Sequence, residues 1–232
     1  HDAYLSVAEA LRHAGYEYGT HIKINWLDSE TITNENASDL LGGCNGIIIP
    51  GGFGSRGIEG MIASAKYARE NNIPYLGICL GMQIAVIEFA RNVCGYADAD
   101  SGEFNPDSAH KVIDFLPEQS DSVNKGGTLR LGSYPCKVRT GTKMYDCYKS
   151  EHIFERHRHR YEFNNDFRKE LVSKGLVISG TSPDEYIVET IELSEKNFFV
   201  GVQFHPEFKS RPNKPHPLFL GLIGASLKKT SK

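Results

Sequence analysis

A cysteine, a histidine and a glutamate occur in this chain where two β-strands are expected to end. Cys79 follows the apolar run 75–78 and precedes an apolar stretch with helical spacing, with a glycine two positions away on each side. This pattern is typical of a sharp strand-to-helix turn that exposes a nucleophile, because glycine tolerates a cramped backbone. The N-terminus of the following helix favours a thiolate over a thiol at Cys79.

His205 and Glu207 supply the other two groups that cleavage of a carboxamide requires. They follow the strand-like run 201–204, and Pro206 between them is expected to keep the backbone extended. Side chains two residues apart on an extended chain share a face, so the carboxylate can orient the imidazole. The thiolate attacks, and the imidazole, whose ordinary pKa is about 6.5, carries the proton to the departing amine. Taken singly, Cys79 could be a core thiol and His205 a structural histidine; their joint occurrence favours catalysis.

A glycine-rich turn, Gly51–Gly54, follows another buried strand-like run at residues 46–50. Its backbone N–H groups could stabilise an oxyanion, and open α/β sheets bind ligands at the carboxyl ends of their strands. A glycine turn after a strand is most often just a turn, so this one gains weight from the neighbouring strand that carries Cys79. The sequence contains neither the phosphate-loop pattern nor the dinucleotide-binding glycine pattern.

The first half of the chain alternates between helical and strand-like patterns. Helices are predicted at residues 4–14, 58–71 and 80–93, and strands at 21–27, 46–50 and 75–78. Because the central runs are apolar throughout, we predict a parallel sheet that is covered by helices on both faces. The sequence begins on a helix, so we expect the usual first strand of such a sheet to lie outside the sequence given.

The second half has a different character. Residues 97–125 are rich in Asp, Pro, Ser and Asn, which predicts a loop with little regular structure. An antiparallel section is predicted at 128–138, 175–181, 186–193 and 198–203, and a closing helix at 217–228. Without repeats or a low-complexity linker, residues 1–232 are predicted to form one α/β domain: a mostly parallel central sheet, flanking helices and an additional antiparallel section.

Composition narrows the range of partners. The 232 residues carry a formal net charge of −3, which gives no reason to expect nucleic acid or an anionic membrane as a partner. No apolar run approaches the roughly 20 residues that span a bilayer, and no signal-peptide pattern is present. The five cysteines lack metal-type pairing, so we expect no metal site, free thiols and a reducing, cytoplasmic setting. Four of them are expected to act as small hydrophobic residues.

Several motifs resemble a known family. Those of the class I, or triad, glutamine amidotransferases are matched by Pro50–Gly54, Gly77–Gln83 and Val202–Glu207. Within this class, the glutaminase domains of the CTP synthase family are matched by Asn72–Gly77, Gly127–Gly132 and Arg156–Asn164. The resemblance covers nearly the whole chain and implies a flavodoxin-like fold. Without it, the basic run 156–160 would be interpreted as a solvated surface.

The resemblance implies a role for each residue that matches a family motif. Cys79 attacks the side-chain amide of glutamine to give a glutamyl thioester and ammonia, His205 is the acid and base, and Glu207 orients it. Backbone N–H groups of Gly52 and Leu80 meet the oxyanion. The other residues implied in binding L-glutamine are Gly81, Met82, Gln83, Glu103 at its α-ammonium group and Arg160 at its α-carboxylate.

The resemblance also implies a longer protein. CTP synthases pair this domain with an ATP-dependent synthetase domain that uses the ammonia to convert UTP to CTP, and we expect that synthetase domain to be absent from this chain. No cofactor is expected in the glutaminase half; the full-length enzyme is expected to use ATP and magnesium, to respond to GTP as an activator and to form a homo-oligomer (tetramer). Phe53 and Arg56 lie in the region that the family associates with the GTP effect, although Ser55 departs from its common sequences.

Three other functions remain open at this point. The chain could be the glutaminase component of another amidotransferase such as GMP synthetase, a hydrolase of γ-glutamyl peptides, or a non-catalytic sensor domain. The stretch Arg156–Asn164 argues against the first, Glu207 as a third catalytic member against the second, and the pair of His205 and Glu207 against the third.

Overall fold

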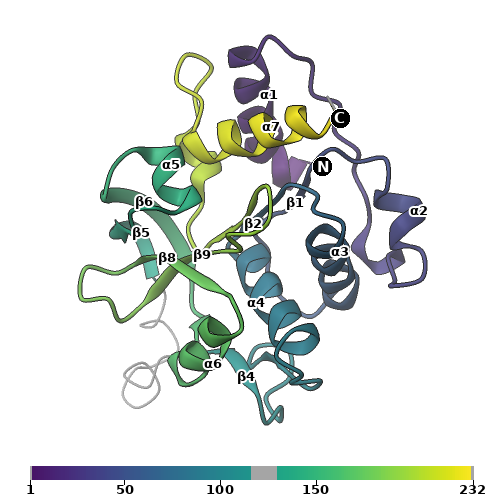
Figure 1. Ribbon diagram of the computed structural model, residues 1–232, viewed down its shortest axis with the longest axis vertical. Helices are drawn as coiled ribbons and strands as arrows, with labels where there is room; N and C mark the ends of the chain where they lie inside the picture. The colour runs from purple at the N-terminus through teal and green to yellow at the C-terminus, as the bar shows by residue number, and fades with distance from the viewer. Residues whose placement is uncertain (1, 116–129, 231–232) are drawn as a thin grey trace.

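The computed structural model describes residues 2–115 and 130–230, and its main sheet has seven strands in the order β1-β2-β10-β9-β8-β5-β6 (Figure 1). Three strands run parallel: β1 (Ile47–Ile49), β2 (Tyr75–Ile78) and β10 (Phe199–Val202). The others continue the same sheet in antiparallel fashion: β9 (Val188–Glu192), β8 (Val177–Thr181), β5 (Arg130–Val138) and β6 (His152–His159). A small second sheet contains β3 (Asp100–Ser101), β4 (Lys111–Asp114) and β7 (Glu162–Phe163).

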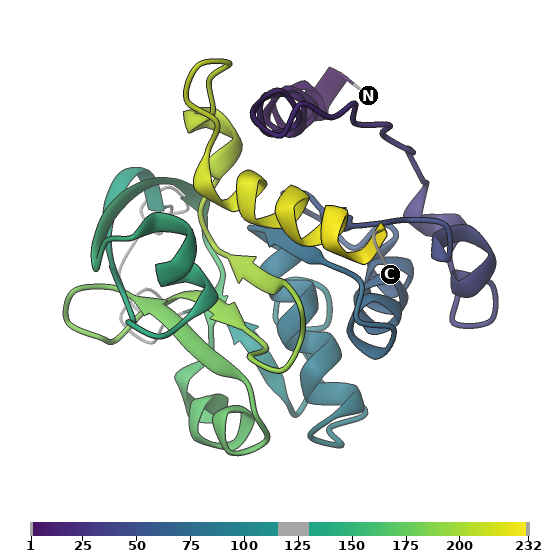
Figure 2. The same ribbon diagram turned by 45° about the horizontal axis from the view of Figure 1, so that its top comes forward.

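Helices cover both faces of the parallel part of the main sheet. The longer ones are α1 (Leu5–Glu17), α3 (Ile58–Glu70), α4 (Leu80–Asn92) and α7 (Pro217–Thr230). The shorter ones are α2 (Ala37–Leu41), α5 (Lys143–Tyr148) and α6 (Arg168–Ser173), with 3₁₀ turns at Asp2–Tyr4, Ser29–Thr31, Asn165–Phe167 and Pro206–Lys209 (η5). Helices α3 and α4 lie on one face of the sheet and α7 on the other, with α1 packed outside α7 (Figure 2). In the described residues no helix is long and apolar enough to cross a membrane.

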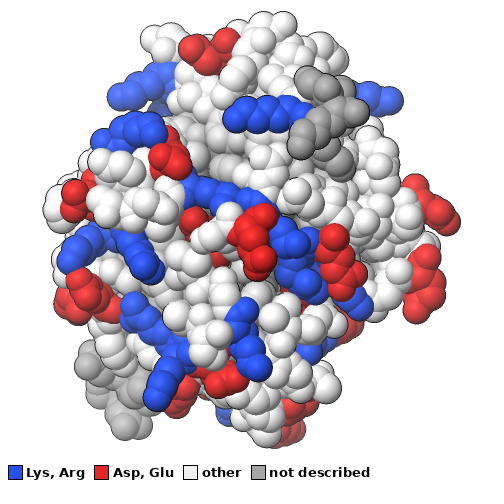
Figure 3. All heavy atoms as spheres, in the orientation of Figure 1, with Lys and Arg blue, Asp and Glu red and all other residues white. Residues whose placement is uncertain are grey.

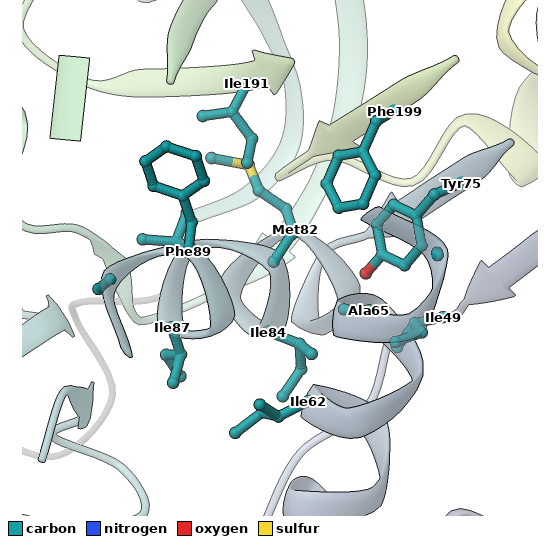
Figure 4. Close-up of a cluster of buried hydrophobic side chains, with 14 of the residues drawn as sticks. Ile49, Ile62, Ala65, Tyr75, Met82, Ile84, Ile87, Phe89, Ile191 and Phe199 are labelled. Atoms are coloured by element: carbon teal, nitrogen blue, oxygen red, sulfur yellow. The ribbon is translucent and has the colours of Figure 1, made fainter. Parts of the chain in front are cut away.

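The two faces of β2 and β10 bury different cores, as alternation along a strand requires. Tyr75 and Phe199 point to the α4 side, where their rings stack with centroids 4.4 Å apart and contact the helix layer (Figure 4). The next residues, Leu76 and Val200, point to the α7 side. All four side chains are at most 2% exposed, so this central pair of strands is fixed from both faces. Acidic and basic side chains are interspersed over the face that Figure 3 shows.

The α/β architecture and most predicted elements are confirmed, with three corrections. Residues 21–27 form no strand: Ile22 and Ile24 are half-buried and alternate with exposed residues, but the segment packs one side against the helices without joining a ladder. The predicted loop at 97–125 contains β3 and β4 in its described part. The basic run 156–160 lies largely in β6, where His157 and His159 are buried between three exposed arginines, so the arginines form a solvated face and the histidines do not. Residues 116–129, including the motif residues 127–129, lie outside the described residues.

Two glycines allow α4 to begin directly against the sheet. A Cβ atom on Gly81 would lie 2.1 Å from the carbonyl oxygen of Ile49, and one on Gly77 would lie 2.5 Å from the backbone of Gly81. The hydroxyl group of Tyr75 donates a hydrogen bond of 2.8 Å to the Gly81 carbonyl. The first turn of α4 is therefore held against β1 and β2 at a distance that no side chain at these positions would permit.

The close approach of Gly81 to the Ile49 carbonyl predicts that Gly81→Ala lowers the free energy of unfolding by at least about 2 kcal/mol, because the added methyl group forces backbone movement in a packed core. Urea titration of the purified chain measures this quantity. Gly43→Ala is the matched control, since a Cβ there meets nothing within 4 Å, and it should change stability by less than about 1 kcal/mol. Equal effects of the two substitutions would contradict the interpretation.

Candidate active site

The candidate site lies where β1, β2 and β10 end side by side. Parallel neighbours bring their carboxyl ends to one edge of the sheet, and the backbone N–H of Cys79 donates a 2.7 Å hydrogen bond to the carbonyl oxygen of Val202. The glycine turn after β1 reaches the same place. A Cβ on Gly51 would lie 2.7 Å from Cε1 of His205 and 3.6 Å from Cβ of Cys79. Glycine is therefore required at position 51 for the two side chains to meet there.

Cys79 occupies a strained turn between β2 and α4. Its φ of 50° and ψ of −102° are unusual for a residue with a side chain. The carbonyl oxygen of Cys79 accepts hydrogen bonds from the N–H groups of Met82 and Gln83, at 3.0 and 3.2 Å, so the strained residue is fixed to the first turn of α4. The prediction of a sharp strand-to-helix turn at this cysteine is confirmed.

His205 and Glu207 are in direct contact, with 2.8 Å between His205 Nδ1 and Glu207 Oε1. The backbone is not extended here, contrary to the expectation from sequence. Residues Pro206–Lys209 form the 3₁₀ turn η5, which begins with proline at its first position. The turn still brings the carboxylate to the imidazole, and both side chains are largely shielded from water.

The environment of His205 favours its charged form. Burial alone would lower its pKa, but hydrogen bonds to Cys79 and Glu207, together with the negative charges of those groups, raise the pKa to about 10. The imidazole therefore lies between the sulfur and the carboxylate, and it keeps its proton through neutral pH. On its outer side, the ring of Phe208 stacks at a centroid distance of 5.5 Å.

Two glutamine side chains extend the site behind the sulfur. Gln203 Nε2 lies 3.6 Å from Cys79 Sγ, and Gln203 Oε1 accepts a 3.3 Å hydrogen bond from Gln83 Nε2. Gln83 Nε2 also donates to the carbonyl oxygen of Tyr161, at 3.2 Å. The sequence analysis did not select Gln203 or Tyr161, although both lie inside the motifs that carried the resemblance.

Glu103 and Arg160 are distant in the sequence and join the site through different neighbours. Glu103 Oε1 accepts a 3.0 Å hydrogen bond from the backbone N–H of Gly54, which ties the loop after β3 to the glycine turn. Arg160 directly precedes Tyr161, whose carbonyl oxygen accepts from Gln83. Burial raises the pKa of Tyr161; the charges of Glu103 and Asp114 raise it further, and that of Arg160 opposes the shift.

The structure supports some, but not all, of the backbone contacts that were predicted for glutamine and its oxyanion. Leu80 is the first residue of α4, so its N–H has no partner within the helix, and a Cβ on Gly52 would lie 3.1 Å from its side chain. Gly81 faces the sheet, and the Met82 side chain is buried among core residues (Figure 4). The N–H of Met82 is bonded to Cys79, so a direct contact of Met82 with substrate remains a prediction without support from this geometry.

The two predicted effector residues are exposed on the surface. Phe53 is 91% exposed, and Arg56 forms a 2.5 Å ion pair with Glu30 on the surface. The structure places them on the loop after the glycine turn and assigns them no contact with the catalytic side chains.

None of the five cysteines forms a disulfide; the four other than Cys79 are buried or half-buried as predicted, and Cys79, also buried, is distinguished by its partners. Burial raises the pKa of the thiols of Cys94, Cys136 and Cys147, for Cys147 to about 12. Thiolate chemistry at these three positions is disfavoured. No cluster of His, Cys, Asp and Glu side chains suited to a metal ion occurs within residues 2–115 and 130–230.

Comparison with known proteins gives consistent matches. The sequence profile of the family described as glutamine amidotransferase class-I matches residues 1–225. The chain is 63% identical over 227 residues to a CTP synthase of Carboxydothermus hydrogenoformans and 58% identical over 226 residues to that of Bacillus subtilis. These alignments cover 98% and 97% of this chain but 42% of each relative, so the chain spans less than half of their length.

Solved structures agree with the sequence matches. The glutaminase domain of the Trypanosoma brucei CTP synthase, determined with bound acivicin, superposes with a TM-score of 0.92 at 41% identity, covering 98% of this chain and 89% of that one. A GMP synthase protein from Thermoplasma acidophilum reaches a TM-score of 0.60 at 18% identity, covering 97% and 90%, which shows a shared fold alone. The chain belongs to the class I glutamine amidotransferase family and, within it, corresponds to the glutaminase domain of CTP synthase.

Proposed function

We propose that this chain hydrolyses L-glutamine through a catalytic triad of Cys79, His205 and Glu207. The observation that carries the proposal is the 2.8 Å contact between His205 and Glu207, with Cys79 on its strained turn as the other partner of the imidazole. The acivicin complex of the trypanosomal relative supports a ligand site in the same fold. A hydrolase of γ-glutamyl peptides is not favoured by any contact in the described residues.

In the proposed reaction the Cys79 thiolate attacks the side-chain carbonyl carbon of glutamine. The N–H groups of Gly52 and Leu80 stabilise the resulting oxyanion, and His205 donates its proton to the amide nitrogen, so that the C–N bond breaks and ammonia leaves. Water then attacks the glutamyl thioester while His205 accepts a proton from it; the C–S bond breaks, glutamate is released and the Cys79 thiolate is regenerated. Glu207 holds the imidazole in orientation and stabilises its charge.

The remaining polar groups suit the two charges of the amino acid. Glu103, which is bonded to the glycine turn, binds the α-ammonium group, and Arg160, which adjoins the Tyr161 carbonyl bonded to Gln83, binds the α-carboxylate. Gln83 contributes an amide beside the sulfur through its contact with Gln203. Gly81 lets the first turn of α4 approach β1, and direct contacts of Gly81 and Met82 with glutamine remain predictions from the resemblance.

In the longer protein that the relatives indicate, the ammonia would serve ATP-dependent conversion of UTP to CTP by a synthetase domain. ATP and magnesium would act in that domain, in a cytoplasmic homotetramer. The exposed Phe53 and Arg56 would mediate the activating effect of GTP, and unchanged GTP stimulation of the full-length enzyme after Arg56→Ala would contradict this role.

The triad predicts a single covalent adduct when the chain reacts with a glutamine-like diazoketone, because Cys79 alone combines a thiolate environment with the substrate site. Intact mass spectrometry should show one adduct for the unaltered chain and for Cys44→Ser, and none for Cys79→Ser. An adduct that persists in Cys79→Ser would sink the assignment of the nucleophile.

The raised pKa of His205 predicts the pH dependence of hydrolysis. The imidazolium needed to protonate the leaving amine is present below its pKa, so kcat/KM for glutamine should fall as pH rises through about 10. Glu207→Gln removes a negative charge that raises this pKa, so the fall should move to lower pH and kcat should drop by about 100-fold or more. An alkaline limb at the same pH in both proteins would contradict the role of Glu207.

The role of Arg160 predicts a change in substrate affinity. Arg160→Met removes the charge that meets the α-carboxylate and should raise KM for glutamine by about tenfold or more, with a smaller effect on kcat. Arg158→Met, which removes the neighbouring exposed arginine of β6, is the matched control and should leave KM within about twofold. Steady-state ammonia release measures both; equal KM values in the two variants would exclude this assignment.

A further inference from the structure

A group of buried charged and polar side chains adjoins the segment that carries Arg160 and Tyr161. We call it the buried charge cluster; its members are Arg130, His157, His159, Glu162 and Glu189. Their side chains are at most 10% exposed. Arg130 lies between the two carboxylates, with Nη2 2.8 Å from Glu189 Oε1 and Nη1 3.5 Å from Glu162 Oε1. Two carboxylates facing one guanidinium would leave an unbalanced negative charge away from water, which is costly.

The hydrogen bonds of the two histidines fix their tautomers. His159 Nδ1 lies 3.3 Å from the carbonyl oxygen of Tyr161, which can only accept, so Nδ1 carries the hydrogen. In a neutral ring His159 Nε2 is then bare, and it must accept from His157 Nδ1 at 2.8 Å. His157 Nε2 is consequently bare as well, and it lies 3.7 Å from Glu189 Oε2.

The cluster therefore lacks one proton. In the described part of the chain, His157 Nε2 and the Oε2 atoms of Glu162 and Glu189 are buried without a hydrogen-bond partner. A proton on one of the two carboxyl groups cancels the unbalanced charge and supplies a donor. Burial also favours a protonated carboxyl group beside neutral imidazoles. It raises the pKa of Glu162 to about 8, raises the pKa of Glu189 as well, and lowers the pKa of His157 to about 2.

Titratable groups from several strands face the two carboxylates. They are Arg130 and Cys136 from β5 and His157 and His159 from β6; His205 after β10 acts on the two imidazoles instead, where its charge lowers their pKa values. The charge of Arg130 opposes the rise in both carboxyl pKa values, and mutual repulsion from Glu189 increases that of Glu162. Burial lowers the pKa of His159 to about 3, so the two imidazoles stay neutral.

The cluster reaches the candidate site through one backbone carbonyl. The carbonyl oxygen of Tyr161 accepts hydrogen bonds both from His159 and from Gln83 Nε2. Gln83 Nε2 is in turn bonded to Gln203, whose own amide nitrogen faces Cys79 Sγ. A shift of the Tyr161 carbonyl would therefore move the Gln83 side chain and the adjacent Arg160.

We propose that the buried charge cluster holds one carboxyl proton at neutral pH and thereby fixes the Tyr161 carbonyl, which positions Gln83 and Arg160 for glutamine. His159 is the positioning residue, because its Nδ1–H group holds the Tyr161 carbonyl through a hydrogen bond. Its catalytic consequence rests on the proposed function, whereas the protonation state of the cluster does not.

The kinetic arm of the test compares two substitutions of His159. His159→Leu removes the donor to Tyr161 and should raise KM for glutamine about five- to tenfold with kcat changed less than about twofold, the size expected for one hydrogen bond. His159→Asn places an amide N–H near the position of Nδ1 and should restore KM to within about twofold. Equal KM values in all three proteins, or equal losses in both variants, would overturn the positioning role.

The second arm does not depend on turnover. Infrared spectra of the chain at pH 7 should contain the C=O band of a buried protonated carboxyl group, which disappears as pH rises through about 8. The band should be lost or shifted in Glu162→Gln and in Glu189→Gln. It should persist in the matched control Glu88→Gln, whose buried carboxylate is bonded to Arg69 instead.

Nitrogen-15 NMR of the histidines completes this arm and should show neutral His157 and His159 rings protonated on Nδ1. A charged imidazole, or spectra without the carboxyl band, would overturn the proposal even if glutamine is hydrolysed. If the chain hydrolyses no glutamine while the spectra show the protonated carboxyl and Nδ1 tautomers, the proposed function fails and the protonation claim stands.

Discussion

The parallel pairing of β10 with β2 is the constraint on which the rest of the site depends. It joins residue 202 to residue 79 by a 2.7 Å hydrogen bond, although more than half of the chain separates them. Cys79 and His205, the proposed nucleophile and base, therefore come from strand ends that are held side by side. The glycine turn after β1 completes the same edge, and Gly51 leaves the space in which the two side chains meet.

Close packing and charge then act together at this edge. The first turn of α4 can approach β1 because Gly81 has no side chain, and this approach fixes the strained backbone of Cys79. The contacts of His205 with Cys79 and Glu207 raise the pKa of its imidazole, so that burial does not neutralise it. In the neighbouring buried charge cluster the balance is reversed: a single guanidinium faces two carboxylates, and a carboxyl group is the member that takes up a proton.

The sequence was most informative where local pattern and fold agree. The boundaries of β2 and of α3 and α4 were predicted almost to the residue, because apolar runs and glycines specify them locally. The strand predicted at 21–27 is wrong because alternation of apolar and polar residues indicates only that one side of a segment is buried. Burial against helices produces the same pattern as a strand at the edge of a sheet. The 3₁₀ turn after His205 was missed because proline is compatible both with extended backbone and with the first position of a turn.

The buried charge cluster shows what local pattern cannot provide. The run 156–160 has the composition of a charged surface, yet β6 turns its histidines inward to partners from the adjacent β7 and from β5 and β9, which are distant in the sequence. Likewise, Gln203 is a neighbour of Cys79 only because β10 pairs with β2, which local sequence pattern does not specify. Tertiary contact, rather than residue type, defines these parts of the site.

The central claim is that Cys79 carries the glutamyl group during hydrolysis. Intact mass of the chain, quenched in acid during turnover with glutamine, tests it most directly. If Cys79 is the nucleophile, a fraction of the chain is heavier by one glutamyl group, with the added mass on the peptide that contains Cys79. The measurement is made in a variant in which hydrolysis of the thioester is the slow step. Ammonia release there without the heavier chain would contradict the role of Cys79.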